Sequence, residues 1–290
     1  MHIAIIGCGE VGGAYGRALA GKASLSLCDI RPDGPPREAA DDLGLELHPA
    51  PGSWLTACDV AIAAVPGGES LAAAASALPF LKDDALYIDV STASPDDKRA
   101  AEAQFTAAGR AIADVAIMTA IALSGAASPV LIAGPEATRA VPVFERMEAP
   151  VTVLEDSAVG DAVSLKLLRS IVVKGLEVLA VESLTAAERL GVRDKLLAQL
   201  GDLDAQPIAT FLAALTTTHI RHAARRMHEV EDAARQLEAM GLEPIVTGAL
   251  PGRYRATLAA ARTKPPGDEA HRSLDAALAW FLSTNRNRGA

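Results

Sequence analysis

The feature that most constrains the fold is a glycine-rich turn near the start of the chain. The apolar segment 3–6 runs directly into Gly7-Cys8-Gly9-Glu10-Val11-Gly12, and a helical pattern follows. Gly7 permits a tight turn, Gly9 lets another group approach the backbone closely, and Gly12 lets the helix pack against the strand. A second apolar segment, 25–28, ends at an acidic residue, Asp29. We therefore expect a strand–turn–helix–strand unit at the N-terminus.

This arrangement predicts a Rossmann-type dinucleotide site, with the pyrophosphate at the helix N-terminus. Asp29 is placed to accept hydrogen bonds from a ribose 2′-hydroxyl, which favours NAD, whereas Arg31 keeps NADP open because a guanidinium can hold a 2′-phosphate. The residues expected to contact the cofactor are Gly7, Cys8, Gly9, Glu10, Val11, Gly12, Asp29, Arg31, Val65, Pro66 and Ser91.

Strand and helix patterns alternate through the first half of the chain, as in a parallel sheet with helices on both faces. Further strands are expected at 45–48, 60–65, 85–89, 111–115, 130–133 and 151–154, with a turn-rich loop at 31–36 and Ser94-Pro95 opening a helix. From Ser157 onward the pattern is helical, with helices expected at 157–190, 193–201, 205–217, 219–240, 245–262 and 270–282. The predicted fold class is therefore α/β: a doubly wound Rossmann domain over 1–155, then an all-α domain over 156–290.

Composition excludes several classes of function. A net charge of −9 and few aromatic residues (3%) disfavour nucleic-acid binding. Apolar stretches are too short to cross a bilayer, and Met1 leads into the first strand without room for a signal peptide. Three cysteines, Cys8, Cys28 and Cys58, fit no disulfide framework and indicate a reducing cytoplasm. We interpret Cys8 as a small residue at a variable position rather than a redox-sensitive thiol.

No metal site is expected. His219, His222 and His228 share one predicted helix, but no H-E-x-x-H-type pattern accompanies them. A solvated or anion-facing helix surface is the simpler interpretation. The alternative is that His222, Arg225 and Arg226 reach a substrate anion, in this chain's cleft or in that of a partner subunit. Asp156 and Asp161, near the start of the long helix, are expected to act as helix-dipole partners.

Three further segments point to an enzyme: Asp89-Val-Ser-Thr-Ala-Ser-Pro95, Asp114-Val-Ala-Ile-Met-Thr-Ala120, and the segment from Gly160 through Lys166 and Arg169 to Ser170. The first two follow strands, where α/β sheets place their ligands. Together they resemble the β-hydroxyacid dehydrogenase superfamily, which includes 3-hydroxyisobutyrate and 6-phosphogluconate dehydrogenases. The similarity covers about the first 190 residues. It implies that Ser91 and Thr92 contact the substrate or nicotinamide and that Lys166 is the general acid/base.

The chain departs from that superfamily at its substrate end. The family's D-A-P-V-S-G-G loop is replaced by a segment with Met118, Thr119 and Ala120 at the serine and glycine positions, and the asparagine after the lysine is Ser170. A small carboxylate is therefore not expected to be held in the usual way. The segment 166–175 and residues 219–232 resemble a less characterised branch with a distinctive helical C-terminal domain.

Helical spacing supports the same site independently. Lys166, Ser170, Lys174 and Glu177 fall on one face, while the neighbouring Leu165, Leu168, Val172, Leu176 and Leu179 are apolar. A polar stripe on an otherwise buried helix is expected to face a wet cleft. Burial and nearby cations would lower the pKa of Lys166. Arg169 and Lys174 are candidate clamps for an anionic substrate, and Ser91, Thr92, Met118, Thr119 and Ser170 complete the predicted substrate site.

The predicted function is an NAD(P)-dependent oxidoreductase that interconverts a secondary alcohol and a ketone of a hydroxy acid-type substrate. Lys166 takes the hydroxyl proton as the hydride leaves for the nicotinamide. Two alternatives remain: an imine reductase acting on C=N, and a non-catalytic dinucleotide-binding sensor. The resemblance also implies a homodimer built through the helical domain.

Overall fold

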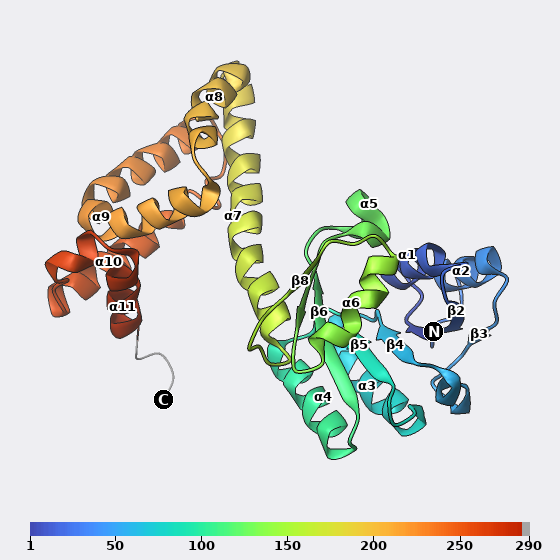
Figure 1. Cartoon of the computed structure of the whole chain (residues 1–290). Coiled ribbons are helices and arrows are strands. Elements are labelled where there is room, and N and C mark those ends of the chain that lie inside the picture. Colours follow the sequence, from blue (N-terminus) through green and yellow to red (C-terminus); the bar gives the residue numbers. More distant parts are fainter. Residues whose placement is uncertain (286–290) are drawn as a thin grey trace. The chain divides into compact units, whose positions relative to one another are not determined.

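The computed structural model describes residues 1–285, and the chain forms two compact units that divide between Ile171 and Val172. Figure 1 colours and labels their elements along the sequence. Each unit is described by itself below.

The first unit is built on one eight-stranded sheet of order β3-β2-β1-β4-β5-β6-β7-β8. All neighbouring strands are parallel except β6 and β7, which are antiparallel. Strands β2 and β3 extend the sheet on one side of β1, and β4 to β8 extend it on the other. The strand order therefore reverses between β1 and β4, which is where open α/β sheets bind ligands. The strands are β1 (His2–Ile6), β2 (Ser24–Cys28), β3 (Leu47–His48), β4 (Val60–Ala63), β5 (Leu86–Asp89), β6 (Ala111–Ile117), β7 (Val130–Ala133) and β8 (Val151–Val153).

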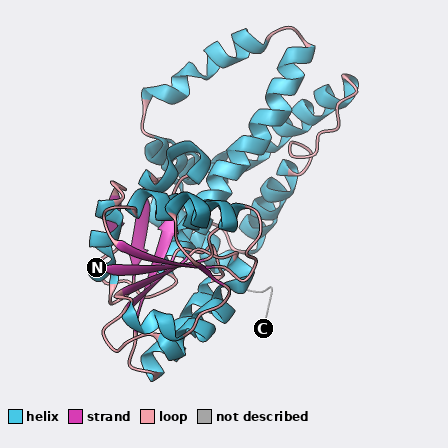
Figure 2. Cartoon of the chain, turned by 90° about the vertical axis from the view of Figure 1, so that its right-hand side faces the viewer, coloured by secondary structure: helices cyan, strands magenta, loops and turns pink. Residues whose placement is uncertain are grey.

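Helices cover both faces of this sheet, as Figure 2 shows. They are α1 (Glu10–Leu19), α2 (Pro35–Leu43), α3 (Ser70–Ala77), α4 (Pro95–Ala107), α5 (Ile121–Ser124) and α6 (Ala137–Arg146), with short 3₁₀ turns at Ser53–Ala57, Gly67–Glu69, Leu78–Phe80 and Gly125–Ala127. The predicted Rossmann fold class is confirmed. The Ser94 side chain caps α4 by accepting from the Asp97 amide, with Pro95 at the first helical position.

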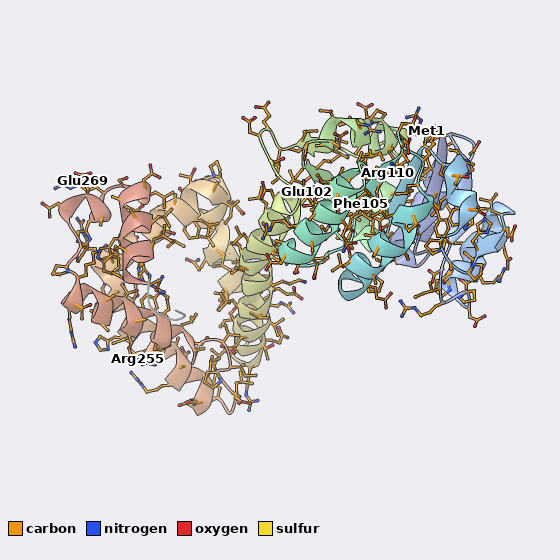
Figure 3. All side chains as sticks on the ribbon, turned by 90° about the horizontal axis from the view of Figure 1, so that it is seen from below. Met1, Glu102, Phe105, Arg110, Arg255 and Glu269 are labelled. Carbon is orange, nitrogen blue, oxygen red and sulfur yellow. The ribbon has the colours of Figure 1, made fainter. Side chains whose placement is uncertain are left out.

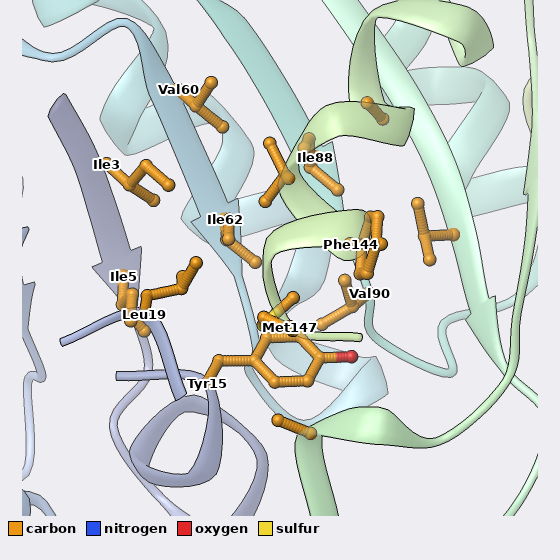
Figure 4. Packing of buried hydrophobic residues seen from close by; sticks show 14 of the residues in the cluster. Ile3, Ile5, Tyr15, Leu19, Val60, Ile62, Ile88, Val90, Phe144 and Met147 are labelled. Atoms are coloured by element: carbon orange, nitrogen blue, oxygen red, sulfur yellow. The ribbon is translucent and has the colours of Figure 1, made fainter. Parts of the chain in front are cut away.

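Side chains alternate between the two faces along each strand and so build two cores. Ile3 and Ile5 of β1 pack on one face with Tyr15 of α1 and Phe144 of α6 (Figure 4). Ala4 and Ile6 point to the other face, where the cluster includes Tyr87 and Phe105. Strands β4 and β7 are buried on both faces and continuously apolar, and β1 is nearly so, which made them predictable.

Helix α2 (Pro35–Leu43) was not predicted, and it overlaps the end of the loop predicted at 31–36. Helix α2 begins at Pro35, because a proline at the first helical position needs no amide partner and is already set to helical φ.

The second unit is helical, as predicted. It contains most of α7 (Asp161–Arg189), then α8 (Arg193–Gln199), α9 (Ile208–Ala239), α10 (Leu250–Thr263) and α11 (Leu274–Thr284), with 3₁₀ turns at Leu200–Ala205 and Asp268–His271. The two helices predicted at 205–217 and 219–240 are instead the single helix α9. In its polar centre the hydroxyls of Thr216, Thr217 and Thr218 donate to carbonyls four residues earlier, so these side chains are hydrogen-bonded without interrupting the helix.

The long helix α7 begins at Asp161 rather than at Ser157, since Gly160 takes a left-handed backbone with φ +100°. Ala162 and Val163 are fully buried, and the Val163 amide donates to Asp114 of β6. The first turns of α7 therefore belong to the sheet unit. For this reason the compact units divide at 171, sixteen residues beyond the boundary predicted from sequence at 155.

The expectation that α7 is buried except for a polar stripe is wrong for the single chain. Leu165, Leu168, Ile171 and Leu176 are 44%, 60%, 71% and 53% exposed. Apolar spacing alone does not say what covers a helix face. None of the helices in residues 1–285 combines the length and apolar character needed to cross a membrane.

Candidate active site

The glycine turn has the close backbone packing that its sequence predicts. Gly7 adopts φ +90°, and a Cβ there would lie 2.6 Å from the carbonyl oxygen of Ala64. At Gly12 a Cβ would lie 1.8 Å from the Gly7 carbonyl oxygen. Gly9 begins α1, and a Cβ added there would meet no protein atom within 4 Å. Two of the glycines are thus required by the turn itself, and the third leaves open space at the helix N-terminus.

Asp29 anchors the turn from the end of β2. One of its carboxylate oxygens accepts the Cys8 amide at 2.7 Å, and the other accepts the Arg31 amide at 2.8 Å. The Arg31 guanidinium turns away to donate to both carboxylate oxygens of Glu69, at 3.2 and 3.1 Å. Each Asp29 oxygen keeps a lone pair, whereas the one cation beside it is already paired.

A cavity of about 720 Å³ extends along this turn. Its lining includes predicted cofactor residues Gly7, Gly9, Glu10, Val11, Asp29, Arg31, Val65 and Pro66. Carboxylates outnumber cations around it, because Glu10, Asp29, Asp33 and Glu69 face the single Arg31.

Cys8, Gly12 and Ser91 of the predicted set do not line this cavity, and their cofactor contacts stay predictions. The Cys8 thiol is fully buried, and burial raises its pKa to about 12. A protonated, buried thiol matches the interpretation of Cys8 as a packing residue rather than a redox-sensitive one.

The loop after β4 connects the glycine turn to the second predicted segment. Ala64 contacts Gly7, as described above, and a Cβ at Gly67 would lie 2.4 Å from the Thr92 carbonyl oxygen. Only a glycine allows the two loops to approach so closely. The turn, the loop 64–68 and the Ser91-Thr92 loop therefore form one continuous wall within the first unit.

Lys166 completes this wall. Its Nζ donates to Thr92 Oγ1 at 2.8 Å, although the two residues are 74 positions apart. The pKa of Lys166 is lowered, first because the side chain is partly buried and then because the charge of Lys98 lies nearby; Asp114 opposes the shift. A lysine with a lowered pKa exchanges protons more readily near neutral pH, as an acid/base group requires.

A buried ion network lies beneath Lys166. The Lys98 side chain is 0% exposed, and its Nζ lies 2.8 Å from Asp114 Oδ1 and 3.5 Å from Asp89 Oδ2. Asp114 accepts the Gly160 and Val163 amides at the start of α7, and Asp89 accepts the Ser91 amide. Lys98 thus holds together the loop that carries Thr92 and the helix that carries Lys166.

Sequence reasoning missed Lys98. Helical spacing could have revealed it, because Lys98, Ala101 and Phe105 occupy one face of α4 and all three are buried. Gly67 and Glu69 were missed as well. They follow Pro66, and only the three-dimensional contacts with Thr92 and Arg31 reveal their roles.

The other predicted substrate residues take different positions. Arg169 donates to the Met118 carbonyl at 3.1 Å, so both lie beside the Lys166 helix turn, and Thr119 is exposed after Met118. The Ser170 hydroxyl donates to the Lys166 carbonyl at 2.9 Å. Lys174 pairs with Glu177 at 2.6 Å, farther along α7. Their roles toward a substrate stay predictions.

Of the two residues predicted to interact with the helix dipole of α7, one lies at the start of the helix and the other before it. Asp161 is the first residue of α7, and its carboxylate accepts the Ala158 amide, so it fits that role. Asp156 lies before the helix with φ +48°. In residues 1–285 no cluster of three His, Cys, Asp or Glu side chains is suited to hold a metal ion.

The residues present fit a nicotinamide dinucleotide. Gly9 leaves the N-terminus of α1 open for a pyrophosphate, and Asp29 retains acceptor capacity for a ribose. Ser91 is 5% exposed, and its hydroxyl has no hydrogen-bond partner in the described residues. A buried hydroxyl without a partner destabilises the fold, and a polar group of the cofactor would supply that partner.

Comparisons with solved structures support this fold. A conserved hypothetical protein from Sinorhizobium meliloti 1021 is 27% identical, with 98% of this chain and 96% of that chain covered and a TM-score of 0.57. The V8 variant of an imine reductase from Myxococcus stipitatus, solved with NAD⁺, is 17% identical over 97% of this chain and 99% of its own, with a TM-score of 0.74. The enzyme from that organism is also solved with NADP⁺.

A 3-hydroxyisobutyrate dehydrogenase from Mycobacterium tuberculosis, solved with L-serine, is 21% identical with a TM-score of 0.63 and covers 97% of this chain and 98% of its own. Two families match the sequence itself. Residues 187–257 match a domain of unknown function, DUF1932, and residues 2–155 match the NAD binding domain of 6-phosphogluconate dehydrogenase. The chain belongs to the latter family, and it is an NAD(P)-dependent dehydrogenase or reductase.

Proposed function

We propose that the protein interconverts a secondary alcohol and a ketone on a hydroxy acid-type substrate, with Lys166 as the general acid/base. The observation that carries this proposal is the 2.8 Å hydrogen bond from Lys166 Nζ to Thr92 Oγ1. It places a lysine of lowered pKa against a loop whose backbone packs on Gly67, in the wall that begins at the glycine turn.

The chemistry divides between cofactor and protein. The nicotinamide, when bound, accepts or supplies the hydride. In the oxidative direction the C–H electron pair leaves the carbinol carbon, and the neutral Lys166 amine takes the hydroxyl proton. In reduction the Lys166 ammonium returns that proton to the carbonyl oxygen. Thr92 orients the amine through its hydroxyl, and Arg169 supplies the nearest guanidinium for an anionic group on the substrate.

Imine reduction is the second candidate. It is favoured by Met118 and Thr119 standing where the superfamily carries its serine and glycine, because an apolar thioether suits a carboxylate less well than a hydroxyl does. Lys166 would then give its proton to the imine nitrogen, instead of to a carbonyl oxygen, as the hydride adds to the C=N carbon.

One experiment separates the candidates. NADH and NADPH oxidation is followed with a panel of 2- and 3-keto acids and a panel of cyclic imines. Keto acid reduction that exceeds imine reduction supports the proposal. The reverse preference assigns the chain to imine reduction, and turnover of neither panel, with cofactor binding intact, favours a dinucleotide sensor.

We further propose a preference for NAD over NADP, set by Asp29 and Glu69. The negative charge of Asp29 repels a 2′-phosphate. Glu69 accepts hydrogen bonds from the Arg31 guanidinium, which would otherwise be free to bind that phosphate. Glu69→Gln frees Arg31 and should improve NADPH binding relative to NADH by about tenfold, the value of one charge-assisted contact. Titration calorimetry with both cofactors measures this ratio; an unchanged ratio removes Glu69 from the account. Asp33→Asn, at another carboxylate of the same cavity, is the control.

A homodimer is proposed as the working assembly. Its support is the set of large apolar side chains left exposed along α7, which includes Leu168, Ile171 and Val181, since exposed apolar surface of this extent marks contact sites. A reducing cytoplasm remains the proposed compartment, which the buried, unbridged cysteines Cys8, Cys28 and Cys58 support.

A further inference from the structure

The helical unit contains a hollow of its own, of about 670 Å³, formed between α9, α10 and α11. Its walls mix apolar side chains with three basic ones. Leu215, Val230, Tyr254, Leu278 and Phe281 supply the apolar part, and His219, Arg226 and Arg253 supply the basic part.

The two guanidiniums are held by neutral groups. Arg226 donates to Thr218 Oγ1 at 3.0 Å, and Arg253 donates to Thr257 Oγ1 at 3.2 Å while lying over the Phe281 ring, 5.2 Å from its centroid. A guanidinium has five N–H donors, so most of the donors on each arginine stay free.

Neighbouring arginines are satisfied differently. Arg225 pairs with Glu229, and Arg255, labelled in Figure 3, pairs with Glu231. In the part of the chain that the structure describes, neither Arg226 nor Arg253 forms such a pair. Glu229 lines the hollow, but its charge is already matched by Arg225. The hollow is therefore a local excess of positive charge in a protein whose net charge is −9.

The third basic residue, His219, is affected by the same excess of positive charge. His219 stacks on Tyr254 with ring centroids 5.0 Å apart, and its Nε2 lies 3.0 Å from Thr257 Oγ1. Burial lowers the pKa of His219, and the charges of Arg253 and Arg226 lower it further. Cations that outnumber the carboxylates beside them are stabilised when an anion binds between them.

We propose that this hollow is an anion-binding site for a small organic carboxylate or phosphate with an apolar body. The free donors of Arg226 and Arg253 would bind the charged head group, and Tyr254, Leu278 and Phe281 would contact the body. The site lies wholly within the helical unit, and the inference does not depend on the reaction proposed above.

The test is calorimetric titration of the full-length protein with benzoate, phenyl phosphate and the uncharged benzamide. Saturating NAD⁺ is present, so that the phosphate-binding end of the cofactor site is filled. Both anions, or one of them, should bind, and benzamide should not. Arg226→Met and Arg253→Met should each weaken the binding by about tenfold or more, as loss of a charge-assisted hydrogen bond does.

Arg221→Met is the matched control, since Arg221 is exposed on the same helix and does not line the hollow; it should leave the affinity within about twofold. Absence of binding by both anions overturns the proposal, as does equal binding by benzamide or wild-type affinity in both arginine variants. If Arg253→Met leaves probe binding intact but changes the sedimentation of the protein, the hollow is an interface between copies, and the proposal fails. Because NAD⁺ binding is titrated separately, a failure there stays distinguishable.

Discussion

The sheet unit and the helical unit are stabilised and specified in different ways. The sheet unit buries its apolar residues in clusters on both faces of the sheet, and its fully buried charged side chains, Asp89, Lys98 and Asp114, pair with one another. The helical unit has one small cluster around Ile220, Ala270, Ala277 and Trp280 and leaves many large apolar side chains exposed. The first unit is therefore a complete core with a preformed cleft, whereas the second has surfaces that still need a partner or ligand.

The largest loss of cofactor affinity is expected at the glycine turn. Gly9→Ala adds a methyl group where no protein atom lies, so the fold should be unchanged, yet the methyl fills the approach of the pyrophosphate. NADH affinity should fall on the order of 100-fold with the melting temperature nearly constant. Gly12→Ala should instead lower both, because its Cβ would lie 1.8 Å from the Gly7 oxygen. A Gly9→Ala protein that binds NADH normally would show that the dinucleotide does not lie on this turn.

Lys98 tests the claim that the sheet unit's buried charges position its cleft. Lys98→Met leaves Asp89 and Asp114 buried without their cation, which should cost about 3–5 kcal/mol of unfolding free energy. Lys82→Met, which breaks a half-exposed pair with Asp59, should cost less than about 1 kcal/mol. Urea unfolding measures both, and equal costs would remove the distinction between the two lysines.

A second measurement, the pKa of Lys166, tests whether Lys98 positions the cleft as well as stabilising the fold. Removing the Lys98 charge takes away one cause that lowers the pKa of Lys166, so this pKa should rise. Oxidation requires the neutral amine, and its pH profile should shift to higher pH in Lys98→Met. Where no substrate is available, the pH dependence of competitive acetylation of Lys166 gives the same pKa. An unshifted pKa in the folded variant would leave Lys98 a structural role only.

The smallest effect on stability is expected at an exposed apolar side chain of α7, Val181. Val181→Asp places a charge among apolar side chains that we propose lie in a dimer contact. Sedimentation should show a lighter species, and the unfolding of the helical residues should come a few degrees lower, whereas the sheet unit should melt as before. Ser183→Asp, which adds the same charge at an exposed position on the opposite side of the helix, is the control. A monomeric wild-type protein would contradict this account of the helical unit's open surfaces.

The difference between the units also explains what the sequence could predict. In the sheet unit, each buried strand is a short apolar run, and Gly7, Gly12 and Asp29 have conformational or charge requirements that few other residues meet. The resemblance to the dehydrogenase superfamily put Thr92 and Lys166 in one predicted site, and the two side chains are joined by a hydrogen bond of 2.8 Å. Lys98 escaped because a charged residue is expected at the surface, and its pairing partners lie 9 and 16 residues away in other elements.

The helical unit was harder to predict. Helical periodicity predicted that this unit is helical but not where each helix ends. A break was predicted at residue 218, whereas the hydroxyls of Thr216, Thr217 and Thr218 donate to carbonyls within the continuous helix α9. Its basic hollow depends on Arg253 meeting residues of α9 and α11, a tertiary contact that no local pattern indicates.

The most direct test of the central claim is the rate of NADH-dependent reduction by Lys166→Met, measured beside its NADH affinity. The best substrate from the keto acid and imine panels is used, with Lys166→Arg to retain charge without a readily removable proton and exposed Lys195→Met as the control. We expect turnover to fall about 10³-fold in Lys166→Met, with NADH affinity within about twofold of wild type. Turnover within a few-fold of wild type would show that another group transfers the proton.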